Sequence, residues 1–181
     1  MNSYQIRYFL KSLNLKVHTG VYAIDQLRYI VIQPLAIVFN NMPSSSVGMH
    51  WCAIIKKSKQ SRIIFFDSLG LHPSFYGKEV MELIERLGGH FLYHNTNIQG
   101  FNTNTCGQHC CFYITKLFSN QTEKAMLKVY SRILSKNDRL VRNFMRKFSF
   151  PRFSKCLKRC LRDPFANICF QKSRKCFSFS N

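Results

Sequence analysis

The sequence predicts an α+β fold in which a small mixed sheet packs on helices, from two kinds of pattern. Short runs rich in β-branched and aromatic residues are separated by loop residues, which is typical of strands. Longer stretches carry an apolar residue at every third or fourth position, which is typical of amphipathic helices. We expect strands at 35–39, 50–55, 62–67 and 90–95. We expect helices at 78–87, 106–118, 122–134 and 138–148.

The segments between these elements are predicted loops because they collect turn-forming residues. Asn, Pro, Ser and Gly dominate residues 40–48, and the polar sequence KKSKQS at 56–61 is turn-like. Residues 97–105 form a further loop, directly ahead of a predicted helix. The first forty residues are mixed in character, and we expect residues 19–22 to form a turn that leads into a short segment.

Length and composition favour one globular domain. The chain has 181 residues, of which 46% are hydrophobic, and this is enough apolar material for a core. No run of 18 apolar residues predicts a transmembrane helix, and the first residues lack the apolar centre of a secretory signal. We therefore expect an intracellular, reducing environment. Eight cysteines there indicate free thiols, a metal site or catalysis rather than disulfides.

A net charge of +19 indicates an anionic partner, for which nucleic acid is the simplest interpretation. Residues 136–181 hold 13 of the 27 lysines and arginines. The regular patterns fade after Ser149, so we predict a domain of residues 1–148 and a basic tail of residues 149–181. The predicted nucleic-acid contacts lie on both sides of this boundary, at Arg139, Arg142, Arg146, Lys147, Arg152, Lys155, Lys158 and Arg159.

The tail interleaves basic residues with phenylalanines, which suits contact with nucleic acid or with an anionic membrane. A solvated extension is the alternative interpretation. Structural zinc sites use closely spaced cysteine pairs, and one such pair, Cys156 and Cys160, occurs here. Cys169 and Cys176 are too far apart to form a second pair, so we expect free thiols and no metal site.

His50 and Asp67 are predicted to be neighbours if strands 50–55 and 62–67 pair as a hairpin. In the expected register the two residues are directly opposed, which places their Cβ atoms about 4.5–5.5 Å apart. The carboxylate would then hold one imidazole nitrogen and leave the other as a base. A surface ion pair without a catalytic role is the alternative, because such pairs are common and contribute little.

Cys106 is predicted to occupy the first position of a helix. Thr105, followed by Gln108 three residues later, matches a capping-box pattern. The partial positive charge of a helix N-terminus favours the thiolate, and a thiolate near an imidazole is a nucleophile for acyl transfer. A small buried hydrophobe is the alternative, and this is the interpretation that we favour for Cys110 and Cys111.

Gln99 lies seven residues before Cys106, in the loop that leads to the predicted helix. A side-chain amide donates hydrogen bonds without titrating. Together with the backbone N–H of Cys106, it could hold an oxyanion, an effect of roughly 3–4 kcal/mol per donor. A single glutamine in a loop is usually just solvated, so its role depends on the other three residues.

The order and spacing of these residues resemble those of the adenovirus-type (adenain-like) cysteine proteases. The match is closest to the proteases of Maverick/Polinton elements and adintovirus-like viruses, and the wider relatives process ubiquitin-like proteins. It covers about residues 18–120 and includes a spacing of 17 from His50 to Asp67 and of 7 from Gln99 to Cys106. The resembling segments are GVYAIDQL (20–27), QPLAIVFN (33–40), GMHW (48–51), FFDSLGL (65–71) and TCGQHCCFYI (105–114).

The resemblance implies a catalytic site in which His50 is the general base, Asp67 its partner, Cys106 the nucleophile and Gln99 the oxyanion donor. It implies an adenain-like fold whose sheet packs on the helix that begins at the nucleophile. The implied activity is cleavage of viral capsid or core precursor proteins, after a small residue such as glycine, in the virion or host nucleus.

The resemblance also bears on activators and on rival functions. It implies DNA as a possible activator and no cofactor for the chemistry. A covalent peptide cofactor is not expected, because no cysteine lies near Gly88, the corresponding position. Trp51 either lines the active-site wall or points away from His50 into the core. The rival functions are a deconjugating protease for ubiquitin-like modifiers and a non-catalytic, basic DNA-packaging protein.

Overall fold

The computed structural model describes residues 1–119, 121–148 and 150, apart from the side chains of residues 123 and 127. The elements below belong to the unit Met1–Ser149. Its helices are α1 (Ser3–Ser12), η1 (Ile24–Tyr29), η2 (Pro73–Tyr76), α2 (Lys78–Arg86), α3 (Cys106–Phe118), α4 (Glu123–Val129) and α5 (Leu134–Arg146), where η denotes a 3-10 helix. Its strands are β1 (His18–Ala23), β2 (Leu35–Asn40), β3 (Trp51–Lys56), β4 (Ile63–Phe66) and β5 (Phe91–Tyr93).

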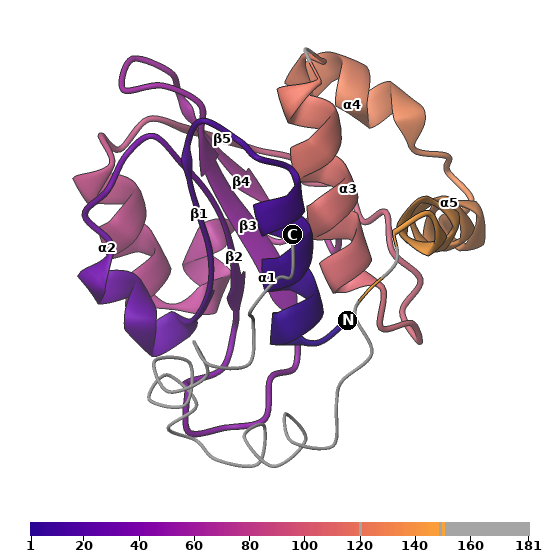
Figure 1. The fold of residues 1–181 in the computed structure, drawn as a ribbon, viewed down its shortest axis with the longest axis horizontal. Coiled ribbons are helices and arrows are strands. Elements are labelled where there is room, and N and C mark those ends of the chain that lie inside the picture. The colour runs from indigo at the N-terminus through magenta and orange to yellow at the C-terminus, as the bar shows by residue number, and fades with distance from the viewer. Residues whose placement is uncertain (120, 149, 151–181) are drawn as a thin grey trace, which may run out of the picture. The chain divides into compact units, whose positions relative to one another are not determined.

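The strands form one mixed sheet in the order β1-β2-β3-β4-β5 (Figure 1). β1 is parallel to β2 and β4 is parallel to β5, whereas β3 is antiparallel to both of its neighbours. Every residue of β2 and of β4 is buried, as expected for strands covered on both faces. The predicted α+β class and the mixed sheet are therefore confirmed.

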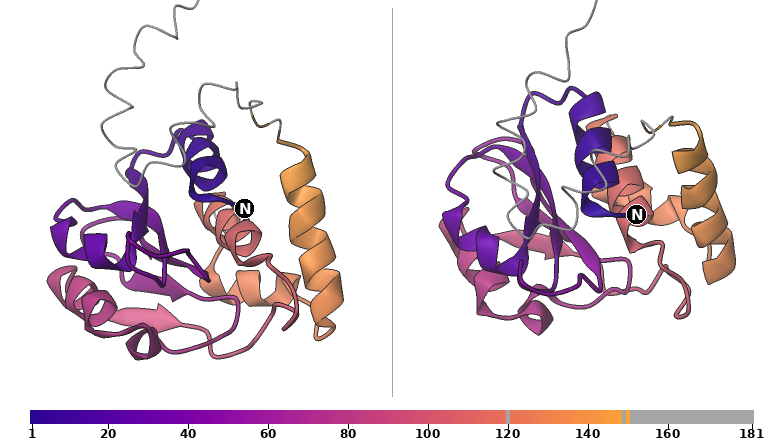
Figure 2. Two further views of the ribbon diagram at one scale, coloured as in Figure 1. Left: turned by 90° about the horizontal axis from the view of Figure 1, so that it is seen from below. Right: turned by 60° about the horizontal axis from the view of Figure 1, so that its bottom comes forward.

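Helices cover both faces of the sheet (Figures 1 and 2). α2 lies with η1 and η2 on one face, and α1 and α3 lie on the other. α4 and α5 pack against α3. Because α3 is enclosed by the sheet and by other helices, nine of its 13 residues are buried, far more than on an ordinary surface helix.

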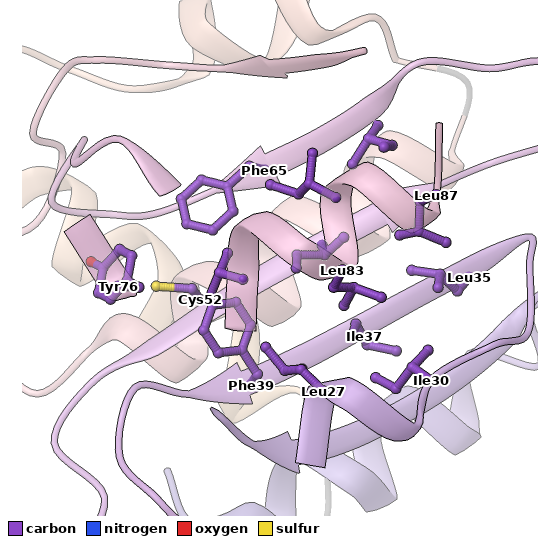
Figure 3. Close-up of a cluster of buried hydrophobic side chains, with 14 of the residues drawn as sticks. Leu27, Ile30, Leu35, Ile37, Phe39, Cys52, Phe65, Tyr76, Leu83 and Leu87 are labelled. Carbon is purple, nitrogen blue, oxygen red and sulfur yellow. The ribbon is translucent and has the colours of Figure 1, made fainter. Parts of the chain in front are cut away.

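The core between the sheet and α2 uses alternate residues of the central strands, because side chains of a strand point to opposite faces in turn. Each large apolar side chain buried here contributes roughly 1.5–3 kcal/mol relative to exposure. Figure 3 shows Cys52 and Tyr76 at one end of this core and Leu87 at the other. The members from the strands, from α2 and from its C-cap are Leu35, Ile37, Phe39, Cys52, Ile54, Ile63, Phe65, Val80, Leu83, Ile84 and Leu87.

The opposite face of the sheet packs against α3. Phe66 of β4 stacks on Tyr113 of α3, with ring centroids 4.1 Å apart and an interplanar angle of 21°. Cys110 and Ile114, one turn apart on α3, are fully buried. This packing fixes the helix that begins at Cys106 against the same strands that lead to His50 and Asp67.

Several predicted elements agree with the structure. α3 occupies the predicted range 106–118, and α2 ends one residue before the predicted limit of 87. All four predicted strands are present, although β5 has three residues rather than six. α4 is much shorter than the predicted helix 122–134, and α5 begins four residues before 138.

The N-terminal region differs most from the prediction. The turn expected at 19–22 is wrong, since these residues lie within β1, which pairs with β2 along its whole length. α1 was not predicted, although Asn2 and Gln5 form a reciprocal capping box ahead of buried Ile6, Phe9 and Leu10. That signal was present in the sequence, because a cap followed by apolar residues at helical spacing indicates a helix start.

None of the helices in the described part of the chain is both long enough and apolar enough to span a bilayer. The predicted absence of a transmembrane segment agrees with this finding for those residues.

Candidate active site

His50 and Asp67 lie side by side at one end of the β3–β4 pair. His50 directly precedes β3, and Asp67 directly follows β4. Both side chains are buried, and His50 Nε2 lies 2.6 Å from Asp67 Oδ1. Because a carboxylate can only accept, Nε2 carries the shared proton and Nδ1 is the ring nitrogen left for another partner. The structure thus brings the two residues together, as predicted.

The strand register behind that prediction is wrong by two residues. Ile54 lies opposite Phe65, whereas the expected hairpin placed Cys52 there. Asp67 follows Phe65 by two residues, so it falls at the level of Cys52 and diagonally across from His50. The two side chains still meet because a shift of two residues keeps each side chain on its face, whereas a shift of one would not.

Asp67 is held by donors from several directions. Its Oδ1 accepts from the N–H of Leu69 at 3.0 Å, and its Oδ2 accepts from the N–H of Leu71 and the hydroxyl of Tyr76, both at 2.9 Å. Burial alone would raise the pKa of Asp67, but the hydrogen bonds and charge of His50, with the two N–H donors, lower it. Asp67 is therefore a carboxylate at neutral pH.

A glycine shapes the turn that follows Asp67. Gly70 has a φ of 74°, and its N–H donates to the Asp67 carbonyl at 3.1 Å. A Cβ at Gly70 would lie 2.6 Å from the carbonyl carbon of Thr96, so both the backbone conformation and the space require glycine. This tight turn directs the N–H groups of Leu69 and Leu71 toward the carboxylate.

Tyr76 and Cys52 also surround His50, and neither was among the predicted site residues. The Tyr76 ring lies nearly parallel to that of His50, with centroids 6.1 Å apart and an interplanar angle of 14°. The Cys52 sulfur points toward Tyr76 (Figure 3). Complete burial raises the pKa of Cys52 to about 11, so this group remains a thiol at neutral pH. Cys52 could have been found from sequence, because it lies two residues after His50 and so shares its strand face.

Cys106 is the first residue of α3, as predicted, but the predicted capping box is wrong. The N-cap residue Thr105 makes no capping hydrogen bond, and its hydroxyl instead donates to Asp138 Oδ1 at 2.5 Å. The first turn of α3 therefore has no side-chain cap. Its N–H groups remain directed toward the end of the helix where Cys106 lies, which favours negative charge there.

Cys106 and His50 shift each other's protonation equilibria. Burial would raise the pKa of Cys106, but hydrogen bonding and charge interaction with His50, aided by the backbone N–H groups of Trp51 and Gly107, lower it. Burial would likewise lower the pKa of His50, but hydrogen bonds to Asp67 and Cys106 raise it well above its usual value. Both shifts favour a thiolate–imidazolium pair.

Gln99 is buried and oriented by two hydrogen bonds. The Ser68 hydroxyl donates to its Oε1 at 2.7 Å, and its Nε2 donates to the Thr103 carbonyl at 2.8 Å. The amide has a second N–H, for which the described residues provide no hydrogen-bond partner. Ser68 directly follows Asp67, so the residue that orients Gln99 belongs to the same turn as the partner of His50.

Two residues of α5 hold the loop that carries Gln99, and sequence reasoning missed both. Asn137 donates to the Ile98 carbonyl at 3.0 Å. Asp138 accepts from the Gly100 N–H at 3.1 Å and from the hydroxyl of Thr105. The helical pattern alone gives no signal for this role, because polar residues at 137 and 138 suit a solvated helix start.

A second buried histidine–aspartate pair lies behind this loop. His109 Nε2 is 3.2 Å from Asp138 Oδ1, and both side chains are almost fully buried. Burial lowers the pKa of His109, so this imidazole is neutral, in contrast to His50. The pair connects α3 to α5.

Trp51 borders the start of α3. Its indole Nε1 donates to the Met1 carbonyl at 3.2 Å, and a Cβ on Gly107 would lie 3.3 Å from its Cδ1. Its carbonyl accepts from the Cys110 thiol at 3.3 Å. The half-buried ring therefore flanks Gly107, the residue next to Cys106.

One group of potential metal ligands occurs within the described ranges. His50, Cys52 and Asp67 offer ligand atoms within 4.8 Å of one another. The same atoms are already engaged, because His50 bonds to Asp67 and Asp67 also accepts from Leu69, Leu71 and Tyr76. The imidazole and the carboxylate of this group are thus engaged in a hydrogen-bonded network of the protein's own donors and acceptors.

The predicted nucleic-acid contacts fall partly on α5. Arg139, Arg142, Arg146 and Lys147 are exposed at the surface of this part of the chain. Arg152, Lys155, Lys158 and Arg159 lie outside the described residues, as do the tail cysteines Cys156, Cys160, Cys169 and Cys176.

Comparison with models of protein families gave no match for this chain. Comparison with curated proteins gave no match either. The chemistry of the site therefore has to be inferred from its own geometry. A thiol whose pKa is lowered by an imidazole, which a buried carboxylate in turn orients, has the features of a nucleophile for acyl transfer.

Removal of the imidazole should make Cys106 less reactive. In His50→Ala the burial of the thiol remains while its main stabilising partner is lost, so its pKa should rise. Each unit of increase lowers the thiolate fraction near neutral pH about tenfold. We expect alkylation of Cys106 by iodoacetamide at pH 7 to slow at least about tenfold, as measured by mass spectrometry of the peptide containing residues 87–116.

The pH profile adds a second criterion. Wild-type Cys106 should remain reactive below the usual thiol pKa of 9.0 and lose reactivity only as the pH falls through its lowered value. His90→Ala, which removes an exposed imidazole, serves as the control and should behave like wild type. Equal rates in wild type and His50→Ala would show that the two side chains are not coupled.

Loss of the Asp138 carboxylate should destabilise the protein. Asp138→Ala leaves the Gly100 N–H and the Thr105 hydroxyl without their acceptor, and an unsatisfied buried donor costs roughly 1–3 kcal/mol. We expect the free energy of unfolding, measured in urea, to fall by about 2 kcal/mol or more. Lys136→Ala, an exposed neighbour on α5, should change it by less than about 0.5 kcal/mol.

Acid should reduce this difference. Hydrogen bonds from Thr105, His109 and Gly100 outweigh burial and lower the pKa of Asp138, so its stabilising contribution is present above the usual value of 3.8. That contribution should disappear as the pH falls through the lowered pKa. A wild-type advantage over Asp138→Ala that did not shrink in acid would contradict an ionised Asp138.

Proposed function

We propose that this protein is a cysteine endopeptidase of the adenain-like type. The observation that carries the proposal is the buried connection from Asp67 through His50 to Cys106, in which the pKa of the thiol is lowered and that of the imidazole is raised. The resemblance of the spacing of these residues to that of adenain-like proteases supports the same reaction class.

The proposed reaction begins with attack of the Cys106 thiolate on the carbonyl carbon of the scissile peptide bond. The resulting tetrahedral intermediate collapses to a thioester when the C–N bond breaks, and the imidazolium of His50 gives its proton to the leaving amine. Neutral His50 then accepts a proton from water as the water attacks the thioester. The carboxylic acid product leaves, and Cys106 is regenerated.

The oxyanion of the tetrahedral intermediate requires donors that are already in place. The uncapped first turn of α3 supplies backbone N–H groups beside Cys106. The second N–H of Gln99 supplies another, because Ser68 and Thr103 hold the amide in a fixed orientation. Donors that do not need to reorganise stabilise the developing charge most effectively.

Asp67 acts in the proposed reaction by orientation rather than by proton transfer. It fixes the proton on Nε2 of His50 and leaves Nδ1 as the nitrogen that would exchange protons with Cys106, substrate and water. Tyr76 supports both residues through its hydroxyl and its ring. The lowered pKa of Asp67 keeps it ionised, so it also stabilises the imidazolium.

The proposed substrates follow from the resemblance to maturation proteases of DNA viruses and related elements. They are capsid or core precursor proteins, cleaved at short linear sites after a small residue such as glycine. A deconjugating protease would instead require a folded modifier that ends in Gly-Gly. A non-catalytic packaging protein would cleave neither substrate.

Substitution of the proposed catalytic residues should abolish cleavage. We expect Cys106→Ala and His50→Ala each to remove all measurable turnover of a peptide library. When catalytic residues act as a unit, replacing any one of them removes nearly all of the activity. Asp67→Asn should slow turnover greatly, since an amide can hold the wrong imidazole tautomer. Gln99→Ala should lower the rate on the order of 10²–10³ for one oxyanion donor.

Cys110→Ala provides a matched thiol control. Cys110 lies one turn from Cys106, but burial and neighbouring thiols raise its pKa well above the usual value, so this substitution should preserve turnover. Full activity in Cys106→Ala would contradict the proposed nucleophile. Cleavage of Gly-Gly-ended modifiers but not of linear peptides would favour the deconjugating alternative.

We further propose that DNA binds through the exposed basic residues of α5 and raises turnover of DNA-bound substrates. Phosphate contacts are independent of base sequence and release counterions, so affinity should fall with a log–log salt slope of about −0.9 per phosphate neutralised. Replacing Arg139, Arg142 and Arg146 with glutamine in the full chain should therefore flatten the slope by about 2–3 while sparing cleavage of a short free peptide.

Fluorescence anisotropy of a labelled duplex over a salt series provides the measurement. Lys78→Gln, which removes one exposed charge from α2, is the control and should leave the slope almost unchanged. Salt-independent binding, or loss of peptide cleavage in the triple variant, would contradict this role of α5.

A further inference from the structure

A basic cavity lies at the end of the β3–β4 pair opposite to the candidate active site. Its volume is about 510 Å³, and its lining includes the side chains of Lys56, Lys59, Ser61, Arg62 and His90. β3 runs from Trp51, next to His50, to Lys56, and β4 runs from Ile63 toward Asp67. The length of the strands therefore separates the cavity from the proposed catalytic residues.

Lys56 gives this cavity an unusual feature, because it is a buried cation without a counter-ion. Its exposed fraction is 6%. Its ammonium group donates to the Leu87 carbonyl, at the C-terminal end of α2, and no carboxylate pairs with it among the residues that the structure describes. Burial of an unpaired charge is costly, and one carbonyl uses one of the three N–H donors of the ammonium.

Lys57, the residue directly after β3, provides a comparison with an exposed lysine. Its Nζ donates to the Leu117 carbonyl at 3.0 Å and lies 5.8 Å from the ring centroid of Phe118, and the residue is exposed. Lys57 thus packs along the surface with its charge in water. Lys56 has almost no access to water, and its remaining N–H donors have no hydrogen-bond partner among the described residues.

The other cationic groups of the cavity are also without acidic partners. Lys59, Arg62 and His90 are exposed, and no acidic side chain lines the cavity among the described residues. The carboxylate of Glu85, on the last turn of α2, lies beside Gly89, which is not part of the lining. The cavity therefore concentrates positive charge, and none of its lining residues is acidic.

Backbone and side-chain hydrogen bonds hold the segments that carry these cationic residues. The Ile63 N–H donates to the His90 carbonyl at 3.0 Å, which fixes His90 beside Arg62. Reciprocal hydrogen bonds between Ser58 and Ser61 brace the turn that carries Lys59. Gly88 has a φ of 116°, a conformation that favours glycine, and a Cβ there would lie in ordinary contact with Lys56 Nζ, at 3.5 Å.

We propose that this cavity binds a phosphate-type oxyanion, with Lys56 as its central ligand and Lys59, Arg62 and His90 around it. Lysine and arginine donors satisfy phosphate oxygens through short, charge-assisted hydrogen bonds. Such an anion would supply the missing counter-charge for Lys56. The phosphate belongs either to a free compound or to a nucleic-acid backbone, and the site does not depend on the proposed proteolysis.

Inorganic phosphate and tripolyphosphate are suitable probes for the full-length protein at constant ionic strength. Site-resolved amide NMR is the required readout, because a chain of net charge +19 also attracts polyanions elsewhere. We expect saturable shifts at the amides of Ser61, Arg62, Gly88 and His90. The affinity should fall about tenfold or more in Lys56→Met, the change in Kd expected for loss of one charged ligand.

Matched variants separate this site from general charge effects. Arg62→Gln, at an exposed position, should also weaken binding and keeps the test valid if Lys56→Met fails to fold. Lys78→Gln removes one charge at the opposite end of α2 and should leave the affinity unchanged. Absence of saturable shifts, or equal losses in Arg62→Gln and Lys78→Gln, would show that Lys56 merely caps α2.

A short duplex DNA identifies the source of the phosphate. If the duplex displaces tripolyphosphate from the same four amides, the site holds a nucleic-acid phosphate. If the duplex shifts other amides and leaves tripolyphosphate bound, the site holds a free phosphate compound. In both cases Lys56→Met should remove the effect at these amides, and persistence of the effect in that variant would overturn the proposal.

Discussion

The hydrogen bonds that converge on Asp67 join parts of the molecule that are distant in sequence. The carboxylate accepts hydrogen bonds from His50 at the start of β3, from two N–H groups in the turn after β4, and from the Tyr76 hydroxyl in η2. A buried carboxylate costs several kcal/mol unless donors satisfy its oxygens, so these contacts must form together. Both pKa shifts stabilise the folded state. The lowered pKa of Asp67 contributes stability above its usual value of 3.8, and the raised pKa of His50 contributes stability that is lost as the pH rises through the raised value. The contribution of the pair is therefore complete between the usual values of 3.8 and 6.5, and it declines above 6.5 as the pH rises toward the raised pKa of His50.

A second buried carboxylate organises the other wall of the candidate site. Asp138 holds the loop around Gly100 and the residue that precedes Cys106, and Asn137 holds Ile98. The sheet thus positions the imidazole, while α5 positions the loop and the helix start. Because Ser68 also binds Gln99, the two walls are linked to each other as well as to the core. The precision of the site follows from polar contacts satisfied at both walls rather than from the thiol and imidazole themselves.

Features that depend on a local sequence pattern could be predicted from the sequence, whereas features that depend on a contact with a distant residue could not. α3 begins at Cys106 as predicted, although the capping box on which that prediction rested does not form. The face shared by His50 and Asp67 follows from the two-residue period of strands, which tolerated an error of two residues in register. The diversion of the Thr105 hydroxyl to Asp138 could not be predicted, because it depends on α5 packing 33 residues away in the chain. β1 was missed for a related reason: its short, mixed sequence becomes a strand through pairing with β2, so tertiary contact decides over local propensity.

Because the chain has few acidic residues, the burial of two carboxylates also affects the balance of charge at the surface. The chain has eight aspartates and glutamates, and two of them, Asp67 and Asp138, are buried inside the polar networks described above. In the described ranges no lysine or arginine forms an ion pair with a carboxylate, and the two ion pairs present involve histidines. These two acids thus serve internal architecture, while the surface cations of α5 and of the Lys56 cavity form no ion pair with a carboxylate among the described residues. Self-repulsion among such cations opposes the compact state, so bound anions should relieve it wherever they gather. The same distribution of charge that attracts a polyanion would then also make the fold more stable in its presence.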